Sequence, residues 1–315
     1  MGLRNRTEAL EINLLREGII ESRHSAEAVI CDDRGRILAS AGNPETGSFI
    51  RSSLKPFQAL AVVNSGTLDR FHLNDRDLSV MCGSHKGLID QVRQVFNIFW
   101  QSDIPVDLLQ CPIPSGGKSR LEYNCSGKHA GMLAVCKQRG WPVDTYMQIN
   151  HPLQQLILQQ VADLLKMPAA EFITAHDDCG VPTVFMQLNQ MGCLFAQLSS
   201  GNNLQMERIV RAMTHHPGMV AGPEQFDTDL MEATQGSLVS KTGAEGIQCV
   251  GRVGEGLGLA IKVKDGAKRA KYAAAIHVLK ELGWIDPNTA DNLATRYQCL
   301  SAHKRLEVNG DLAMI

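Results

Sequence analysis

A serine and a lysine three residues apart are the first candidates for chemistry in this sequence. They are Ser52 and Lys55, in the run Ser-Ser-Leu-Lys at the predicted start of a helix. Residues three apart on a helix lie one turn apart on the same face, so the amine reaches the hydroxyl. A lysine whose pKa is lowered by burial or by another cation can take the proton of such a serine. The same spacing also fits a serine that caps a helix beside a solvated lysine.

A second lysine, Lys241, begins the run Lys-Thr-Gly on a predicted strand near the C-terminus. Penicillin-recognising serine hydrolases combine Ser-x-x-Lys with Lys-Thr-Gly, and their third motif is Ser-Asp-Asn. That third motif is missing here. In its place the sequence has Cys-Gly-Ser-His, where a glycine-flanked turn after a helix presents the hydroxyl of Ser84. A strand-end lysine and an ordinary loop are the alternative interpretations.

A loop of small residues at positions 124–131 opens a predicted helix. Free N–H groups and the helix dipole at such a point can bind an anion such as a carboxylate. The loop contains Cys125, and Cys179 lies further along in the run Asp-Asp-Cys-Gly. Two thiolates and one more ligand can hold zinc. Because the sequence has no Cys-x-x-Cys and no histidine pair, two buried free thiols are the alternative.

The composition excludes several classes of function. The chain has 315 residues and a net charge of −2, so it lacks the basic surplus that nucleic acids and acidic membranes attract. Hydrophobic residues make up 44% and charged residues 20%, which is typical of a globular protein. The nine cysteines are an odd number, and the N-terminus has no export signal. We therefore expect free thiols, no nucleic acid or membrane partner, and a cytoplasmic location.

The elements that must position these residues follow from the pattern of apolar residues. A hairpin is predicted over residues 27–40, where two β-branched runs flank Asp-Asp-Arg-Gly. The middle of the chain is mainly helical, and strands return late. The predicted helices cover residues 52–66, 77–81, 87–101, 128–137, 152–166, 206–214, 268–282 and 287–296, and the late strands lie within 237–253, 257–263 and 305–310.

This order of elements predicts an α+β fold, in which early and late strands share one sheet and the helical middle is an insertion. We expect a single catalytic unit over residues 1–315. Residues 1–50 with 236–315 would contain the sheet, and residues 51–235 would be mainly helical.

Six motifs in the same order give the sequence a family resemblance. They are RSSLKPFQAL, CGSHKG, NCSGKHAGMLA, DDCGVPT, HHPGMVAGPEQFDT and LVSKTGAEG, the last followed by GLGLAIKVKDG. From about residue 20 to the C-terminus, the chain resembles the rhizobial-type L-asparaginases of the asparaginase II family. The resemblance implies a fold like that of the serine β-lactamases and glutaminases, with an antiparallel sheet flanked by helices and a helical lobe. It also implies a homodimer that hydrolyses L-asparagine, a small-molecule substrate, to L-aspartate and ammonia.

The resemblance also assigns roles to residues. Two serine–lysine pairs serve in the family, and its motifs correspond here to Ser52, Lys55, Ser84 and Lys241. The family's zinc site has two cysteines and a lysine, which correspond to Cys125, Lys128 and Cys179, and no organic cofactor is implied. The sequence departs from the family after Ser84, where an acidic residue is lost and a lysine is gained.

These assignments lead to a hypothesis for the reaction. Ser52 is the nucleophile and Lys55 is its base, held partly neutral by Lys241. Ser84 and Lys241 pass a proton to the departing ammonia, and water then cleaves the acyl-enzyme. Each of the two serines is expected to lie beside a lysine, so the choice of nucleophile between Ser52 and Ser84 stays open.

An amino-acid substrate also needs partners for its carboxylate and its amine. The candidates for the carboxylate are Arg51, His85, Asn124 and Gly127, and the candidate for the amine is Asp178. A surface arginine, a capping asparagine and a structural aspartate are the alternatives. Glutaminase activity, a penicillin-recognising hydrolase of the same fold and an inactive amino-acid-binding protein are the alternative functions.

Overall fold

The structure is a computed structural model that describes residues 7–315. Residues 1–6, which begin the N-terminus examined for an export signal, lie outside the described residues. The chain divides into two compact units. Unit 1 consists of the residues up to Ser53, Met186–Gly201 and Asp229–Ile315, and unit 2 of Leu54–Phe185 and Asn202–Thr228.

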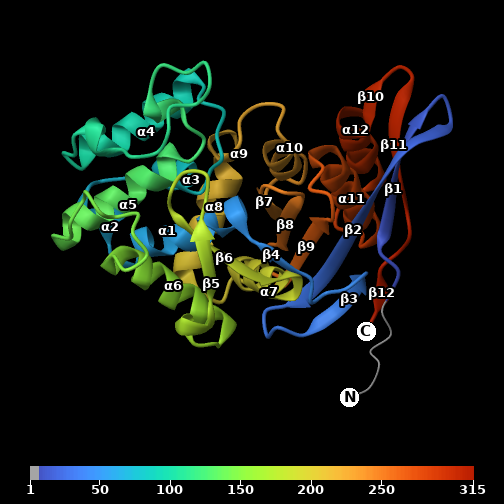
Figure 1. Ribbon diagram of the computed structural model, residues 1–315, viewed down its shortest axis with the longest axis horizontal. Helices are drawn as coiled ribbons and strands as arrows, with labels where there is room; N and C mark the ends of the chain where they lie inside the picture. The colour runs from blue at the N-terminus through green and yellow to red at the C-terminus, as the bar shows by residue number, and fades with distance from the viewer. Residues whose placement is uncertain (1–6) are drawn as a thin grey trace. The chain divides into compact units, whose positions relative to one another are not determined.

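Unit 1 is built on an antiparallel sheet with the strand order β10-β11-β1-β2-β9-β8-β7 (Figure 1). Strands from the two ends of the sequence pair directly, because β2 lies beside β9 with Ala28 opposite Ile261. β3 pairs with β2 and with β12. The strands are β1 (Leu10–Arg16), β2 (Ile19–Asp32), β3 (Ile37–Ala41), β4 (Gly47–Phe49), β7 (Leu238–Thr242), β8 (Ile247–Arg252), β9 (Leu257–Val263), β10 (Cys299–Ser301), β11 (Lys304–Asn309) and β12 (Ala313–Met314).

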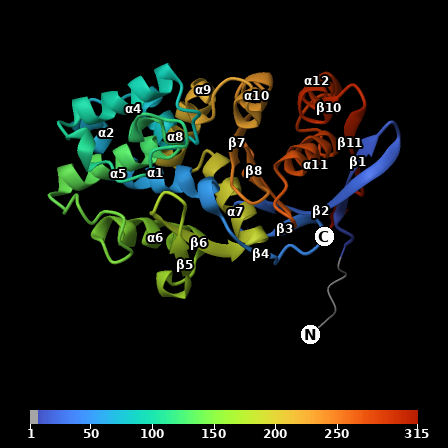
Figure 2. The same ribbon diagram turned by 45° about the horizontal axis from the view of Figure 1, so that its top comes forward.

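Helices of unit 1 pack on this sheet. α7 (Leu188–Ser199) lies against β2, β8 and β9, while α11 (Lys268–Glu281) contacts β9 and β11 and packs beside α12 (Pro287–Tyr297) (Figure 2). α7 approaches β9 closely, because a Cβ atom at Gly258 would collide with the carbonyl oxygen of Gly192. The apolar faces of these elements form the core of the unit. α10 (Phe226–Ala233) contains the boundary between the two units.

Unit 2 is mainly helical. α1 packs against α5 and α6, and α3 packs against α4, α5 and α8. The hairpin of β5 and β6 pairs Ala175 with Thr183. The helices are α1 (Lys55–Asn64), α2 (Thr67–Arg70), α3 (Asp75–Met81), α4 (Ile89–Gln101), α5 (Ser126–Arg139), α6 (Pro152–Leu165), α8 (Leu204–His215) and α9 (Pro217–Val220), with 3-10 turns η2 (Val106–Leu108), η3 (Arg120–Glu122) and η4 (Ala169–Glu171); the strands are β5 (Ile173–His176) and β6 (Pro182–Gln187).

The α+β class and the sharing of one sheet by early and late strands are therefore confirmed. One boundary differs where the nucleophile was expected. The helix predicted from residue 52 begins as a 3-10 turn, η1 (Arg51–Leu54), and α1 starts only at Lys55. Pro56 stands in the first turn of α1, where a missing N–H costs no hydrogen bond within the helix.

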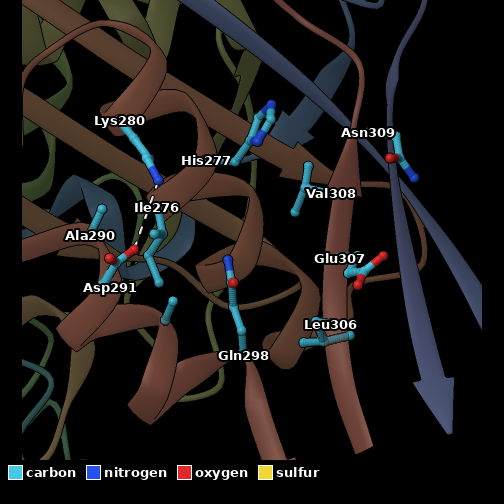
Figure 3. Close-up of a pocket in the computed structure, with 11 residues that line it drawn as sticks. Ile276, His277, Lys280, Ala290, Asp291, Gln298, Leu306, Glu307, Val308 and Asn309 are labelled. Carbon is cyan, nitrogen blue, oxygen red and sulfur yellow. Dashed lines mark ion pairs between the residues drawn. The ribbon is translucent and has the colours of Figure 1, made fainter. Parts of the chain in front are cut away.

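Unit 1 also has a surface pocket of about 300 Å³ among α11, α12 and β11 (Figure 3). Lys280 and Asp291 form an ion pair at 3.8 Å in it. The residues that line it include none of the predicted site residues. In the part of the chain that the structure describes, no helix combines the length and apolar character needed to cross a bilayer.

Candidate active site

A buried lysine and a half-buried serine meet in unit 2. Lys55, the first residue of α1, has no exposed surface. Its Nζ lies 3.0 Å from the Oγ of Ser84 and donates to the carbonyl oxygens of Gly83 at 2.5 Å and Asn124 at 3.3 Å. A lysine removed from water needs such partners, because an unpaired buried amine costs several kcal/mol. This arrangement brings a titratable nitrogen to a hydroxyl that solvent reaches.

The backbone after α3 fixes where Ser84 stands. The N–H of Ser84 donates to the carbonyl oxygen of Val220 at 2.6 Å. Gly83 is required beside it, because a Cβ atom there would lie 2.6 Å from the carbonyl oxygen of Met219. The segment thus packs against α9, and a backbone hydrogen bond fixes the position of Ser84.

His85 ties the same segment to α5. Its Nδ1 accepts from the N–H of Gly87 at 3.1 Å, so Nε2 carries the proton and donates to the Oγ of Ser126 at 2.9 Å. Burial, and then the nearby charge of Lys55, lowers the pKa of His85 to about 3. The imidazole is therefore neutral, with both nitrogens engaged inside the protein. This geometry is better suited to positioning the loop of Ser84 than to binding a carboxylate by charge.

Ser52 and Lys241 belong to unit 1. Ser52 is half-buried in η1, and the residue before it, Arg51, has a φ of 53°, which an L-residue seldom adopts. The next residue, Ser53, donates from Oγ to the carbonyl oxygen of Lys241 at 3.0 Å. A hydrogen bond therefore joins strand β7 to the turn that carries Ser52. Strain of this kind is frequent at functional sites.

Lys241 is fully buried on β7, opposite Cys249 of β8. Its Nζ donates to the carbonyl oxygen of Thr242 at 2.8 Å. The residue that sequence reasoning missed is Lys271 on α11, which is only 4% exposed and donates to Thr242 and Gly243. No local pattern in the sequence marks it, because the exposed Lys268 stands one turn before it in the same helix.

The two cysteines and the lysine of the predicted zinc site come together in unit 2. Lys128 Nζ lies 3.2 Å from the Sγ of Cys179, and all three side chains are buried, at 4% exposure or less. The S–H of Cys179, with the charges of Lys55 and Lys128, holds the pKa of Cys125 well below that of an ordinary thiol. Burial works against the charge of Lys128, but Cys179 and Cys125 raise its pKa above the usual lysine value.

This donor set fits zinc, because a thiolate, a second thiol and a nitrogen converge in a site closed to solvent. The lysine would have to lose its proton to donate a lone pair, as any metal ligand must. The resulting set of two sulfurs and one nitrogen leaves a position open for a further ligand.

The remaining predicted binding residues lie around these groups in unit 2. Asn124 is exposed, and its Oδ1 lies 2.9 Å from the Sγ of Cys125. Gly127 has a packing role, because a Cβ atom there would collide with the carbonyl oxygen of Val80 on α3. Asp178 is exposed beside Cys179. The structure thus groups Lys55, Ser84 and Asn124 with the cysteine–lysine cluster, and it describes Arg51, Ser52 and Lys241 within unit 1.

The chain is similar to proteins of known family and structure. The sequence profile of L-asparaginase II matches residues 12–314. No curated protein matches the sequence. Among solved structures, the glutaminase Mglu in its native form matches with 12% identity and a TM-score of 0.42, over 82% of this chain and 61% of that one. A β-lactamase from Mycobacterium bovis matches with 11% identity and a TM-score of 0.36, over 86% of this chain and 94% of that one. The chain therefore spans about three fifths of the length of Mglu.

Proposed function

The chain belongs to the L-asparaginase II family, and we propose that it hydrolyses the side-chain amide of L-asparagine to give L-aspartate and ammonia. Membership of the family supports an amide hydrolase in general. The observation that carries the chemistry is the contact of Lys55 Nζ with Ser84 Oγ at 3.0 Å. A lysine in hydrogen-bond reach of a second hydroxyl can pass a proton through it to the leaving nitrogen, which amide cleavage requires.

We assign Ser52 as the nucleophile and Lys55 as its general base. The serine oxygen forms a bond to the amide carbon while its proton moves to Lys55. Backbone N–H groups of Ser52 and of the stretch after Gly243 would stabilise the negative oxygen of the tetrahedral intermediate. Preorganised donors of this kind are commonly worth about 3–4 kcal/mol each.

Ser84 supplies the route for the second proton. Lys55 holds the proton taken from the nucleophile, and its contact with Ser84 lets the serine hydroxyl pass a proton to the departing nitrogen. The carbon–nitrogen bond breaks, ammonia leaves, and an aspartyl ester of Ser52 remains. Water then attacks the ester, with the same two groups returning the protons in reverse. Lys241, buried on β7, is proposed to take part with Ser84 in passing the proton to ammonia.

Arg51 and the exposed Asn124 are proposed to bind the carboxylate of the substrate, and Asp178 its amine. Guanidinium and amide groups donate to carboxylates, and a carboxylate accepts from an ammonium. His85 has a different role in this proposal, because a neutral imidazole with both nitrogens engaged holds the loop of Ser84 in place.

Cys125, Lys128 and Cys179 are proposed to hold a zinc ion. When bound, it supplies fixed positive charge near the substrate-binding residues and rigidifies the loop before α5. The protein residues carry out every proton transfer described above. The ion is assigned to organisation of the site and not to activation of water.

An ammonia-release assay on the purified chain tests the function. We expect turnover of L-asparagine, and slower turnover of L-glutamine, because one methylene in a pocket changes kcat/KM by about 10- to 200-fold. Faster release from L-glutamine would favour a glutaminase. Labelling by a fluorescent penicillin, without amide turnover, would favour a penicillin-recognising hydrolase. Binding of L-asparagine without turnover would indicate an inactive amino-acid-binding protein.

A further inference from the structure

Three side chains of unit 1 that the proposed reaction does not use converge near the end of α11. They are His277 and Glu281 on α11 and Asp311, which follows β11. A ring nitrogen of His277 and one carboxylate oxygen from each of the other two lie within 4.8 Å of one another. Bonds of about 2.0–2.2 Å to a metal ion place its ligand atoms about 3–4 Å apart. Small side-chain rotations therefore bring all three groups onto one ion.

The chain holds these residues together from two segments. His277 and Glu281 are one helical turn apart on the same face of α11. Asp311 belongs to the segment that leads from β11 into β12, and both of its neighbours are tied to the helix. The carbonyl oxygen of Gly310 accepts from Nε2 of His277 at 2.8 Å, and the N–H of Leu312 donates to Oε1 of Glu281 at 2.9 Å. The backbone thus fixes Asp311 beside the two helix residues.

The contact of His277 with Gly310 also decides which ring nitrogen can bind a metal ion. A carbonyl oxygen only accepts, so Nε2 carries a proton and donates it. In the neutral ring Nδ1 then keeps the lone pair. Metal-binding histidines commonly donate their other N–H to a backbone carbonyl, which fixes both the tautomer and the orientation of the ring. His277 has this arrangement, which a surface group made of carboxylates alone does not offer.

The two carboxylates of this group lie close together without a positive partner. In the part of the chain that the structure describes, no ion pair includes Glu281 or Asp311. The neighbouring amine of Lys280 pairs instead with Asp291 of α12, at 3.8 Å (Figure 3). Two carboxylates at this separation repel each other, and a bound cation removes the repulsion. The local charge therefore favours a cation at this point.

We propose that His277, Glu281 and Asp311 bind a divalent first-row transition metal ion, with water in its remaining positions. One imidazole nitrogen and two carboxylate oxygens suit ions such as Mn²⁺ and Zn²⁺, whereas Ca²⁺ and Mg²⁺ prefer oxygen ligands alone. His277 also lines the surface pocket among α11, α12 and β11, so an ion can enter from solvent (Figure 3).

The bound ion has a structural role in this proposal. It connects α11 to the segment that leads into β12, and β12 pairs with β3 through Ala313 opposite Ser40. A ligand that joins the two segments stabilises their folded arrangement by mass action. The site therefore holds the C-terminal end of the chain on unit 1 and takes no part in the cleavage of the amide.

Manganese alone is the probe, because Mn²⁺ prefers carboxylate and imidazole ligands to the thiolates of the cysteine–lysine cluster. The full chain is dialysed against a chelator and titrated with Mn²⁺, while electron paramagnetic resonance measures the free ion. We expect saturable binding by the wild type, weakened about 10-fold or more in each of His277→Gln, Glu281→Gln and Asp311→Asn. Cys179→Ala should bind Mn²⁺ like the wild type, since its change lies in the other cluster.

Asp291→Asn is the matched control for this titration. It removes an exposed carboxylate that lines the same pocket and leaves the three proposed ligands intact. Its affinity for Mn²⁺ should stay within about twofold of the wild type. Equal weakening in Asp291→Asn and Asp311→Asn would show attraction to a negatively charged surface and would overturn the site. Unchanged affinity in the three ligand variants, or a wild type that binds no Mn²⁺ at about 1 mM, would overturn it as well.

Hydrogen exchange followed by mass spectrometry tests the structural role on the wild type itself, so it does not depend on the folding of a variant. Saturation with Mn²⁺ should slow the exchange of residues 310–315, because the ion ties Asp311 to α11. Asp311→Asn should exchange alike with and without Mn²⁺. Unchanged exchange in the saturated wild type would overturn the structural role. None of these measurements depends on turnover of L-asparagine, so their outcome is separate from that of the proposed function.

Discussion

Lys55 Nζ lies 3.0 Å from the Oγ of Ser84, a residue 29 positions further along the chain. In the sequence the same lysine is paired with Ser52, three positions before it. The amine of Lys55 therefore has two serine partners. Ser52 is its neighbour in the sequence, and Ser84 is its contact in the folded structure. This relationship suits a relay, in which Lys55 receives a proton from one oxygen and delivers it through the other.

The relay predicts different losses for the two serines. Ser52→Ala removes the nucleophile, and we expect kcat to fall by about 10⁴-fold or more. Ser84→Ala removes only the proton donor to ammonia, and we expect a fall of about 10²- to 10⁴-fold, since water can partly replace it. Steady-state ammonia release measures both, and Ser301→Ala, an exposed serine on β10, is the control. Near wild-type turnover by Ser52→Ala would refute the assignment of the nucleophile.

The packing of Gly83 predicts that the position of Ser84, and not only its chemistry, matters. In Gly83→Ala the new Cβ atom would lie 2.6 Å from the carbonyl oxygen of Met219, so the segment must shift. We expect a loss of about 1–3 kcal/mol in the free energy of unfolding and a lower kcat, since overpacking moves backbone. Urea unfolding and ammonia release measure the two effects. Gly218→Ala is the matched control, because a Cβ atom there meets nothing within 4 Å. An unchanged kcat in Gly83→Ala would contradict the prediction, because it would show that the turn accepts a Cβ atom without moving Ser84.

The sequence was sufficient to predict the fold class and the elements that carry the site, because their patterns are local. The helices over residues 87–101, 152–166 and 268–282 are present as α4, α6 and α11 within a few residues. α7 was not predicted. Most of its residues are buried, and its polar face is narrow, with only Asn189, Gln190 and Gln197 partly exposed, so the helical period in the sequence is weak.

The partners of the lysines were harder to predict for a physical reason. The contact of Lys55 with Ser84 depends on how the segment after α3 packs on α9, which no local pattern encodes. Lys271 shows the same limit, because its sequence neighbours do not distinguish a buried lysine from the exposed Lys268 one turn before it. The cluster of Cys125, Lys128 and Cys179 was reached through the family resemblance, since the two cysteines lie far apart in the sequence.

The burial of His85 predicts a loss of stability in acid. The folded protein keeps the pKa of this imidazole at about 3, below the usual value of 6.5, because burial and then Lys55 disfavour its charged form. Between these two values the unfolded chain binds a proton that the folded protein excludes. Above pH 6.5 the imidazole is neutral in both states, so its contribution to the free energy of unfolding is complete. As the pH falls from 6.5 toward 3, this contribution is lost, at up to about 1.4 kcal/mol per pH unit.

His85→Gln checks this prediction, because an amide does not titrate in this range. We expect the free energy of unfolding of the variant to fall less steeply than that of the wild type when urea unfolding is repeated from pH 6.5 down to pH 4. His303→Gln, at an exposed position, is the control and should keep the wild-type slope. Identical slopes for His85→Gln and the wild type would show that His85 takes up its proton in the folded protein.

The cysteine–lysine cluster predicts a metal-dependent stability. If Cys125, Lys128 and Cys179 bind zinc, a chelator should lower the Tm of the purified protein, because a ligand that binds only the folded state stabilises it by mass action. Added zinc should restore the Tm, and elemental analysis should find about one ion per chain that is lost in Cys179→Ala. Cys136→Ala is the matched control, since Cys136 is a buried free thiol on α5, the helix that carries Lys128. Cys136 lies eight residues beyond Lys128 on α5, more than two helical turns from the cluster, so the control should bind zinc like the wild type. If the chelator leaves both the Tm and the affinity for L-aspartate unchanged, the cluster is a buried lysine–thiolate pair that stabilises unit 2 through its own charges.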